Sequence, residues 1–398
     1  MKQRIAIVTT KQPSTNPRMR KNADALHHAG YDVQVLYAYT TTWADNADTA
    51  HFAKQTWRHH RIGGHPQLEK WAYFIHRVTR KWATWTGRTD LKFCPSIKAY
   101  EKELRTFNPD LVIGHNPGAL PILTQWKKKA RGPVLFDAED YHSGESADGS
   151  PEQAQMMDFE DHHLNQLHRM TAASPLIAAA YRQRFPHINV SIVDNAFESE
   201  QQPQFQYLTS APLKLVWFSQ VIGLDRGLLE FFRGLVGLSK TPLEITLIGT
   251  CDNPTKATLE QTLASDLHRL QWLPPCAEPE LMKEVSKHHI GLALEPGFSQ
   301  NNQIAQSNKL FTYPLCGCWT LASQTPAQVQ FFEEFPALGE VLDLNNGHQW
   351  AERLKALAGS LDVLNHQRRV AWNEAQSHLN WETESKKLLN VVNELLTE

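Results

Sequence analysis

Two stretches of the sequence combine a polar loop, an expected helix start and a positively charged side chain. In "LALEPGFSQNNQIAQSNKLFTYPLC" a strand is expected to end at Glu295, and a long polar loop leads to a helix that should begin near Ser307. Loops this long inside compact α/β units are usually functional. Ser307 suits the N-cap, so Asn308 and Lys309 fall in the first turn, where a lysine opposes the helix dipole. The position favours binding of an anion by backbone N–H groups and the ammonium; the alternative is a lysine that only meets solvent.

The second stretch is "WFSQVIGLDRGL", residues 217–228. A strand is expected to end at Phe218, a loop containing Gly223 follows, and a helix should begin near Arg226. Backbone N–H groups, a helix N-terminus and a guanidinium together suit a diphosphate. The alternative is an ordinary strand–helix loop with a surface arginine. Both stretches follow strand ends in the same half of the chain, so they can face one ligand.

Short apolar runs alternate with helical patterns along the chain, which predicts parallel α/β units. One series runs from "RIAIVTT" to "NVSIVDNAF", and a second runs from "LKLVWFSQ" to "CWTLAS". The polar, proline-bearing segment 199–212 reads as a linker, and a long amphipathic tail begins at about residue 347. A chain of 398 residues suits two domains. We therefore expect two doubly wound parallel-sheet domains with the binding site in the cleft between them.

Composition excludes several classes of protein. Lys and Arg number 40 against 42 Asp and Glu, so the chain has no overall attraction for nucleic acid. The five cysteines are scattered, and no second pair or histidine cluster accompanies the "CGC" of residues 316–318, so we expect free thiols, no metal and a reducing cytosol. The opening "MKQRIAIVTT" is too short for a secretory signal, and no long apolar run predicts a membrane span.

The segment "EKWAYFIHRVTRKWATWTGR", residues 69–88, predicts a basic amphipathic helix. Such a helix suits the interface of an anionic membrane, whereas the alternative is an aromatic stripe packed on its own domain. A basic aromatic patch also suits single-stranded nucleic acid, but no nucleic-acid module accompanies it. The apolar face holds Trp71, Phe74, Ile75, Val78, Trp82 and Trp85, and the cations around it are Lys70, Arg77, Arg80, Lys81 and Arg88.

Several motifs together resemble a known family. "WFSQVIGLDRGL", "LEITLIG", "LQWLP", "IGLALEP", "SNKLFTYPLCGCWTLAS" and "NWETESKKLL" resemble the donor half of GT-B glycosyltransferases, in particular family-4-like enzymes of bacterial surface-polysaccharide biosynthesis. "TTKQPSTNPRMRKNADALHHAGYDVQVL" and "NPDLVIGHNPGALP" are similar to the acceptor half. The resemblance covers nearly the whole chain. It implies a Rossmann-like acceptor domain over residues 1–200, a donor domain over 205–379, and a final helix at about 380–398 that packs back on the first domain.

The resemblance implies transfer of a hexose-type residue from a nucleotide sugar to a hydroxyl of a glycan or lipid-linked glycan, with retention of configuration. No cofactor is expected, because fixed cations would stabilise the departing diphosphate without a metal. The implied place is the cytoplasm, with contact to the inner face of the cell membrane through residues 69–88. Two alternatives stay open: a sugar-nucleotide epimerase of the same fold, and a non-catalytic transferase-like binding protein.

In the second half, the resemblance implies that Arg226 and Lys309 bind the donor pyrophosphate and that Glu295 with the 297–306 loop holds the sugar. Gln220 stands where an arginine is often found. Thr312 stands where a glutamate commonly accepts hydrogen bonds from the ribose; a threonine hydroxyl can form only one such bond, so Glu295 is a candidate to replace it. The other expected donor-binding residues are Gly223, Ser307 and Asn308.

In the first half, the resemblance implies that His115, at a strand end, hydrogen-bonds the transferred sugar and leaving group; the alternative is a capping histidine. The segment "FDAEDYHSGE" supplies an acidic–histidine cluster in which a carboxylate can act as base on an acceptor hydroxyl, and Glu139 is our candidate. Acceptor binding is expected from the same cluster and from the first strand–helix loop, where Asn16 can alternatively cap the helix. These acceptor-binding candidates are Asn16, Arg18, Asp140 and His142.

Overall fold

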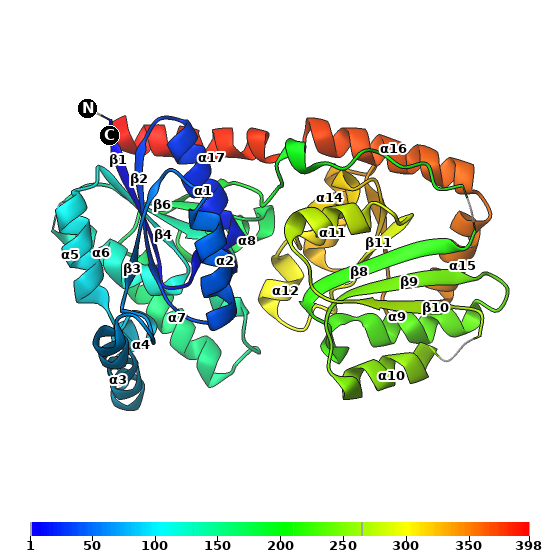
Figure 1. Cartoon of the computed structure of the whole chain (residues 1–398), viewed down its shortest axis with the longest axis horizontal. Helices are drawn as coiled ribbons and strands as arrows, with labels where there is room; N and C mark the ends of the chain where they lie inside the picture. The colour runs from blue at the N-terminus through cyan, green and yellow to red at the C-terminus, as the bar shows by residue number, and fades with distance from the viewer. Residues whose placement is uncertain (1, 130, 210, 264–265, 398) are drawn as a thin grey trace. The chain divides into compact units, whose positions relative to one another are not determined.

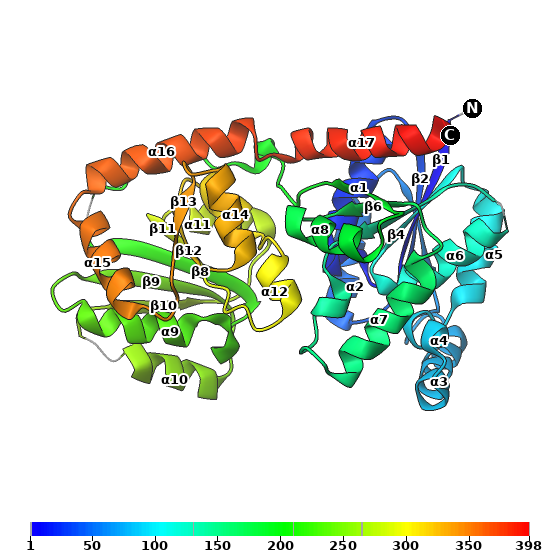
Figure 2. The same cartoon turned by 180° about the vertical axis from the view of Figure 1, so that it is seen from behind.

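The computed structural model describes residues 2–129, 131–209, 211–263 and 266–397, and the chain divides into two compact units. Unit 1 comprises Met1–Asp194 and Ser385–Glu398, and unit 2 comprises Asn195–Glu384. Each unit is built around one sheet with helices on both faces (Figures 1 and 2). Among the described residues, no helix has the length and apolar character needed to cross a bilayer.

Unit 1 contains a seven-stranded sheet of order β3-β2-β1-β4-β5-β6-β7, in which every pair is parallel. The chain winds outward in both directions from β1 and β4, so a topological switch point lies between these two strands. The strands are β1 (Arg4–Thr9), β2 (Asp32–Ala38), β3 (Arg58–Ile62), β4 (Leu111–His115), β5 (Val134–Ala138), β6 (Arg169–Ala172) and β7 (Asn189–Ile192).

The helices of unit 1 cover both faces of this sheet, with α1 on one side and α5 and α6 on the other (Figures 1 and 2). The central strands are buried on both faces, which is why β1 and β4 read as continuous apolar runs. The helices are α1 (Pro17–His28), α2 (Thr42–Phe52), α3 (Lys70–Thr86), α4 (Thr89–Phe93), α5 (Ile97–Phe107), α6 (Leu120–Lys128), α7 (Pro151–Leu164), α8 (Pro175–Arg184) and α17 (Trp381–Thr397), whose residues from Ser385 onward group with this unit.

Unit 2 contains a six-stranded parallel sheet of order β10-β9-β8-β11-β12-β13, with its switch point between β8 and β11. One apolar core lies against α9, α10 and α15, and another lies against α11, α13, α14 and α16. The strands are β8 (Leu213–Val221), β9 (Leu243–Thr250), β10 (Arg269–Leu273), β11 (Ile290–Ala293), β12 (Trp319–Ser323) and β13 (Gly339–Leu342). The helices are α9 (Leu228–Gly234), α10 (Asn253–Leu263), α11 (Glu278–Val285), α12 (Gln300–Ile304), α13 (Lys309–Leu315), α14 (Pro326–Glu334), α15 (Gly347–Ala358) and α16 (Leu361–Ser377).

The predicted pair of doubly wound parallel-sheet domains is confirmed, but several local expectations were wrong. β3 was missed because its sequence "RHHRI" is polar, as an edge strand with only one neighbour can be. β13 extends the second sheet beyond β12, which was expected to be the last strand. The long loop after Glu295 contains α12, and α13 begins at Lys309. Ser307 is therefore not the N-cap; Asn308 holds that position, and its side chain forms no capping bond.

Candidate functional site

A buried ion pair lies at the carboxyl ends of the central strands of unit 1. Asp137 of β5 is fully buried, and Arg18 of α1 donates two hydrogen bonds of 2.8 Å to its carboxylate and one of 2.7 Å to the carbonyl of Val193. Burial by itself would raise the pKa of Asp137, but the charges of Arg18 and His115 and a hydrogen bond from Thr171 hold it at about 2. Arg18 therefore lies inside α1, not in the preceding loop, and its guanidinium bonds to the protein itself.

His115, at the end of β4, connects this ion pair to Glu139. Its Nδ1 lies 3.3 Å from Oδ2 of Asp137 and 3.0 Å from Oε1 of Glu139, while its Nε2 lies 3.4 Å from Nδ2 of Asn22. His115 is fully buried, whereas the Glu139 side chain keeps 25% of its surface exposed. Of these two candidates, Glu139 is the one with access to a ligand. His115 is placed to hold Glu139 in position.

The alternative in which Asn16 caps the helix is confirmed, and the same side chain also contacts Glu139. Its Oδ1 accepts a hydrogen bond of 2.9 Å from the backbone N–H of Met19, which caps α1. Its Nδ2 donates to Oε1 of Glu139. One amide side chain therefore ties the start of α1 to the carboxylate.

A second acidic–histidine group follows β5. His142 is buried, and its Nδ1 lies 2.6 Å from Oε1 of Glu145. Burial lowers the pKa of His142, but the hydrogen bond and charge of Glu145 and the charges of Asp140 and Glu160 outweigh it, so the net shift is upward. Nε2 of His142 is buried and has no hydrogen-bond partner among the described residues. The imidazole therefore retains a proton to higher pH than an ordinary histidine and still has one nitrogen to offer a ligand.

Both groups contain potential metal ligands. The ligand atoms of His115, Asp137 and Glu139 all lie within 4.8 Å of one another, and the same holds for Asp140, His142 and Glu145. In the first group the Arg18 guanidinium already neutralises Asp137, and its charge opposes a cation. We therefore assign no metal to the group of His115, Asp137 and Glu139.

In unit 2, Lys309 meets a carboxylate of the chain itself. Its Nζ lies 3.0 Å from Oε1 of Glu295, just beyond β11, and both side chains are nearly buried. Asn302 of α12 donates a 3.0 Å hydrogen bond to Oε2 of Glu295, and Nζ of Lys309 lies 5.4 Å from the ring centre of Trp217. Burial raises the pKa of Glu295, but the charge and hydrogen bond of Lys309 outweigh it, and the pKa is lowered. Lys309, at the start of α13, is thus paired with a carboxylate of its own chain and is not the solvent-exposed lysine of the alternative.

Arg226 belongs to the same electrostatic group. It ends a short 3-10 turn, Leu224–Arg226, and its Nη2 donates a 3.1 Å hydrogen bond to Oγ of Ser219. Its charge contributes to the lowered pKa of Glu295. The next residue, Gly227, has φ +77°, and a Cβ there would lie 3.1 Å from side-chain atoms of Leu294 and Leu344, so the turn requires glycine. Two cations and one carboxylate therefore gather at the switch point of unit 2.

Thr312 does not offer its hydroxyl outward. It is almost fully buried, and its Oγ1 donates a 2.9 Å hydrogen bond to the carbonyl of Asn308 in its own helix. This back-bonding is common for threonine inside helices. Asn308 is exposed and its Oδ1 accepts a 3.0 Å hydrogen bond from Asn195, Ser307 is half-buried, and Gln220 is exposed near the end of β8.

A cavity of about 570 Å³ opens beside Glu295 at the carboxyl ends of β11 and β12. Two further carboxylates line it, Glu230 of α9 and Asp343, which follows β13. Sequence reasoning missed both, because neither belongs to a motif that we had singled out. Their acceptor oxygens suit the hydroxyl groups of a sugar or ribose.

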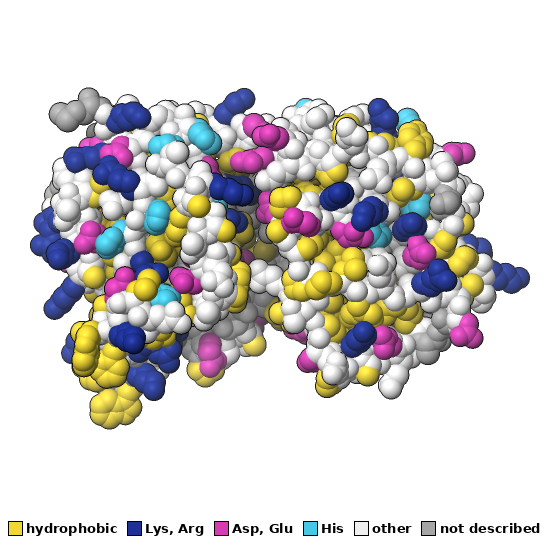
Figure 3. Space-filling model, viewed as in Figure 1, with side chains coloured by type: hydrophobic (Ala, Val, Ile, Leu, Met, Phe, Trp, Pro, Cys, Tyr) yellow, Lys and Arg dark blue, Asp and Glu magenta, His cyan; other side chains and the backbone are white. Residues whose placement is uncertain are grey.

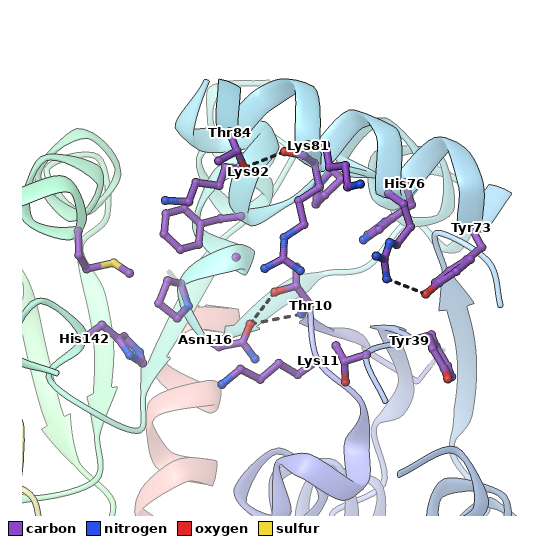
Figure 4. Close-up of a pocket in the computed structure, with 18 of the residues that line it drawn as sticks. Thr10, Lys11, Tyr39, Tyr73, His76, Lys81, Thr84, Lys92, Asn116 and His142 are labelled. Carbon is purple, nitrogen blue, oxygen red and sulfur yellow. Dashed lines mark hydrogen bonds between the residues drawn. The ribbon is translucent and has the colours of Figure 1, made fainter. Parts of the chain in front are cut away.

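A larger cavity of about 690 Å³ lies in unit 1 between α3 and the carboxyl ends of β1 and β4 (Figure 4). Asn116 shapes its floor: it has φ 57°, and its Oδ1 accepts hydrogen bonds of 2.9 and 3.3 Å from the hydroxyl and N–H of Thr10. His142 and Glu145 also line this cavity. Its positively charged lining residues are Lys11, Arg77, Arg80, Lys81 and Lys92.

The helix α3 forms as predicted and ends at Gly87, which has the left-handed conformation of a helix C-cap. The alternative in which its aromatic stripe packs on its own domain is wrong, because the stripe is exposed: 80% of the surface of Trp71 and 85% of that of Trp85 is accessible. Figure 3 shows hydrophobic side chains gathered over α3 at the lower left, with Lys and Arg side chains beside them.

Comparisons with known proteins agree with this fold. Residues 15–196 match a family model described as a glycosyl transferase 4-like domain. The chain resembles a sucrose-phosphate synthase from Thermosynechococcus elongatus, with TM-score 0.74, 12% identity and 100% of both chains covered. It also resembles HepE of Anabaena, solved in complex with UDP-glucose, with TM-score 0.67 and 12% identity over 98% of this chain and 100% of that chain.

A third solved structure, UDP-GlcNAc 2-epimerase of Neisseria meningitidis bound to UDP-GlcNAc, matches with TM-score 0.59 and 12% identity over 98% of this chain and 100% of that chain. At such identities the likeness establishes the fold, and the expected GT-B class is confirmed. A search of curated protein sequences returned no match.

Proposed function

We propose that the chain is a glycosyltransferase that moves a sugar from a nucleotide-sugar donor, bound by unit 2, to a hydroxyl of a glycan or lipid-linked glycan, bound by unit 1. The group of Lys309, Arg226 and Glu295 beside the 570 Å³ cavity of unit 2 carries this proposal. The glycosyl transferase 4-like match and the UDP-glucose complex of HepE support it.

The departing diphosphate gains negative charge as the bond to the sugar breaks. Fixed cations that are already in position stabilise this charge without reorganisation, and Lys309 with Arg226 provides two of them. In this proposal Glu295 orients the Lys309 ammonium, and Glu230 and Asp343 accept hydrogen bonds from donor hydroxyls, a task that the buried Thr312 does not perform. Because side chains meet this charge, we propose a metal-independent reaction. We also propose retention of configuration, which requires the acceptor hydroxyl to attack on the face of the sugar from which the diphosphate departs.

On the acceptor side, Glu139 receives the proton of the attacking hydroxyl. Nδ1 of His115 lies 3.0 Å from Oε1 of Glu139, and Nδ2 of Asn16 donates a hydrogen bond to the same oxygen. The buried pair of Arg18 and Asp137 fixes His115 in turn. His115 and Arg18 are therefore positioning residues in this proposal, and Glu139 is the catalytic one.

A screen of nucleotide sugars by thermal shift tests this function. One donor among the common UDP-, GDP- and ADP-sugars is expected to raise the melting temperature, because a ligand at 100 times its Kd stabilises the fold by about 2.7 kcal/mol. The shift should persist in EDTA if the site needs no metal. No shift with any donor would contradict the proposal and favour a non-catalytic protein.

The likeness to UDP-GlcNAc 2-epimerase favours a second candidate, an epimerase that needs no acceptor. Incubation of the stabilising donor with the protein alone separates the two. An epimerase would convert the free nucleotide sugar, detected by chromatography. The transferase is expected to leave it unepimerised and to release nucleoside diphosphate when an acceptor is added.

We also propose that unit 1 contacts an anionic membrane through α3. Its exposed apolar face and the surrounding cations suit the interface. The protein is expected to sediment with phosphatidylglycerol vesicles and much less with phosphatidylcholine vesicles. The variant Trp71→Ser/Trp85→Ser should lose most of this binding, since both side chains are exposed and their loss should leave the fold intact. Equal sedimentation of the variant would contradict the assignment.

A further inference from the structure

The helix α1 directs a second buried side chain at the ion pair of unit 1. Asn22 lies four positions after Arg18, so the two side chains project from the same face of the helix. Asn22 is fully buried, and its Nδ2 lies 3.2 Å from Oδ2 of Asp137 and 3.4 Å from Nε2 of His115. One amide therefore contacts both the carboxylate of the ion pair and the imidazole beside it.

The contact with Asp137 determines which end of the Asn22 amide faces these two residues. The pKa of Asp137 is about 2, so at neutral pH its carboxylate is ionised and only accepts hydrogen bonds. An amide oxygen 3.2 Å from its Oδ2 would be repelled, so the NH2 group of Asn22 lies there. This group has two hydrogens, one for Oδ2 of Asp137 and one for Nε2 of His115. That nitrogen of His115 is therefore an acceptor and carries no proton.

The other side of the His115 ring leads to the same protonation state. Its Nδ1 faces Oε1 of Glu139 at 3.0 Å and Oδ2 of Asp137 at 3.3 Å. Oε1 of Glu139 also accepts from Nδ2 of Asn16, so both oxygens that face Nδ1 are acceptors. An unprotonated Nδ1 would place its lone pair against two carboxylates, and the proton therefore lies on Nδ1. The charge that His115 contributes to the low pKa of Asp137 applies at acidic pH, where Asp137 titrates.

The remaining contacts of the Asn22 side chain indicate that its NH2 group is needed for His115. Its Oδ1 is buried and has no hydrogen-bond partner among the described residues, which disfavours an asparagine at this position. Asp137 has other donors, because Arg18 donates to both of its oxygens and Thr171 to one. Within the described part of the chain, Asn22 supplies the one hydrogen bond to Nε2 of His115.

We propose that Asn22 is a positioning residue: it holds His115 as the Nδ1–H tautomer, so that the imidazole donates to Oε1 of Glu139. This inference rests on the proposed glycosyltransferase function and adds one residue to the support of its general base. Because His115 and Asn16 both donate to Oε1, Oε2 is the oxygen of Glu139 that receives the proton of the acceptor hydroxyl. Without the Asn22 donor, His115 can carry its proton on Nε2, and its Nδ1 then repels Glu139.

Long-range ¹H–¹⁵N correlation NMR of the full chain, labelled with ¹⁵N-histidine, tests the position of the proton without any turnover. The spectrum distinguishes Nδ1–H, Nε2–H and doubly protonated rings, and a His115→Gln variant identifies the His115 signals among those of the 19 histidines. Near neutral pH the wild type is expected to show the Nδ1–H form, and Asn22→Leu should lose it in at least part of the molecules. Thr171→Val is the matched control: it removes another hydrogen bond to Asp137 but none to His115, so the Nδ1–H signals should be retained.

Turnover distinguishes a positioning role from a purely structural one. Asn22→Leu should lower kcat by about 10–10²-fold, because Glu139 is still present but is misplaced. The KM for the donor and the donor-induced thermal shift should be unchanged, because the proposed donor-binding residues belong to unit 2. The melting temperature should stay within about 4 °C of the wild type, since leucine also removes the unpartnered amide oxygen.

An Nε2–H or doubly protonated His115 ring in the wild type would overturn the inference, and so would full kcat in an Asn22→Leu variant whose His115 signals have changed. A loss of kcat that only matches the loss of folded protein would assign Asn22 to the stability of α1 alone. A wild type with the Nδ1–H signals but no donor-induced thermal shift would instead contradict the transferase, and with it the role of Asn22 in turnover.

Discussion

Lys309→Met is expected to lower kcat/KM by about 10²–10³-fold, the usual effect of removing one preorganised group that stabilises developing negative charge. Methionine preserves the length and packing of the side chain against Trp217 but removes the ammonium. The substitution also leaves Glu295 nearly buried and unpaired, which should cost about 3–5 kcal/mol of unfolding free energy. A single variant therefore mixes a loss of catalysis with a loss of stability.

The double variant Lys309→Met/Glu295→Gln separates these effects. Removal of both charges leaves no buried unpaired ion, so the free energy of unfolding in urea should return to within about 1 kcal/mol of the wild type. Turnover should not return, since the cation for the diphosphate is still missing. Lys287→Met, which breaks the more exposed pair with Glu284, is the control and should change stability by less than about 1 kcal/mol and leave turnover unchanged.

Recovery of turnover in the double variant would assign Lys309 to the structure of the loop and not to the donor. Full turnover in the single variant would have the same meaning. Either result would leave Arg226 as the remaining candidate cation of unit 2, since its charge also acts on Glu295.

The fold could be predicted because buried parallel strands are recognisable as short apolar runs in the local sequence. Strands such as β4 and β11 are short apolar runs bounded by polar loops. The candidate His115 ends β4, and the candidate Glu295 lies two residues beyond the end of β11. The edge strand β3 carries no such run, since one of its sides has no partner strand and its residues are mostly polar. The sequence thus allowed us to predict that the candidate residues lie near strand ends, but it did not allow us to predict the edge strands of the sheets.

Contacts within the site were harder to predict from the sequence, because they join residues that are distant in the chain. Arg18 and Asp137 are separated by 119 positions, and only the folded sheet brings α1 against β5. The pairing of Lys309 with Glu295 crosses a loop whose helix α12 was not foreseen. A lysine that the sequence suggests is a free cation can form a buried ion pair in the folded protein, as Lys309 does. The periodicity of the sequence does not reveal whether such a pair forms.

The cavity of unit 1 could not be predicted either, because its cations come from segments that are distant in the chain. These cations are Lys11, Arg77, Arg80, Lys81 and Lys92. The sequence identified Arg77, Arg80 and Lys81 as the charged border of an amphipathic helix. Lys11 and Lys92 belong to different segments, so no local pattern connects them to that helix. The pattern predicted an amphipathic helix and left open whether its apolar face is exposed, whereas the cavity beside it depends on the arrangement of three segments of the chain.

Glu139→Gln is the second substitution with a large expected effect. Glutamine keeps the shape of the side chain and an oxygen for Asn16 and His115, but it cannot receive a proton. Loss of a positioned general base typically lowers the rate by about 10²–10⁴-fold, so kcat should fall by that amount at saturating donor and acceptor. The donor-induced thermal shift should be unchanged, because the proposed donor-binding residues belong to unit 2. Glu139→Asp should recover part of kcat, since it restores a carboxylate at a shorter reach.

Glu152→Gln, an exposed carboxylate at the start of α7, is the matched control and should keep full kcat. A normal kcat in Glu139→Gln together with an inactive Lys309→Met would show that Glu139 does not receive the proton of the attacking hydroxyl. In that case the departing diphosphate, held by Lys309 and Arg226, would be the remaining acceptor for the proton of the attacking hydroxyl, and Glu139 would only shape the acceptor site. The two substitutions read together thus distinguish a base supplied by unit 1 from one supplied by the leaving group in unit 2.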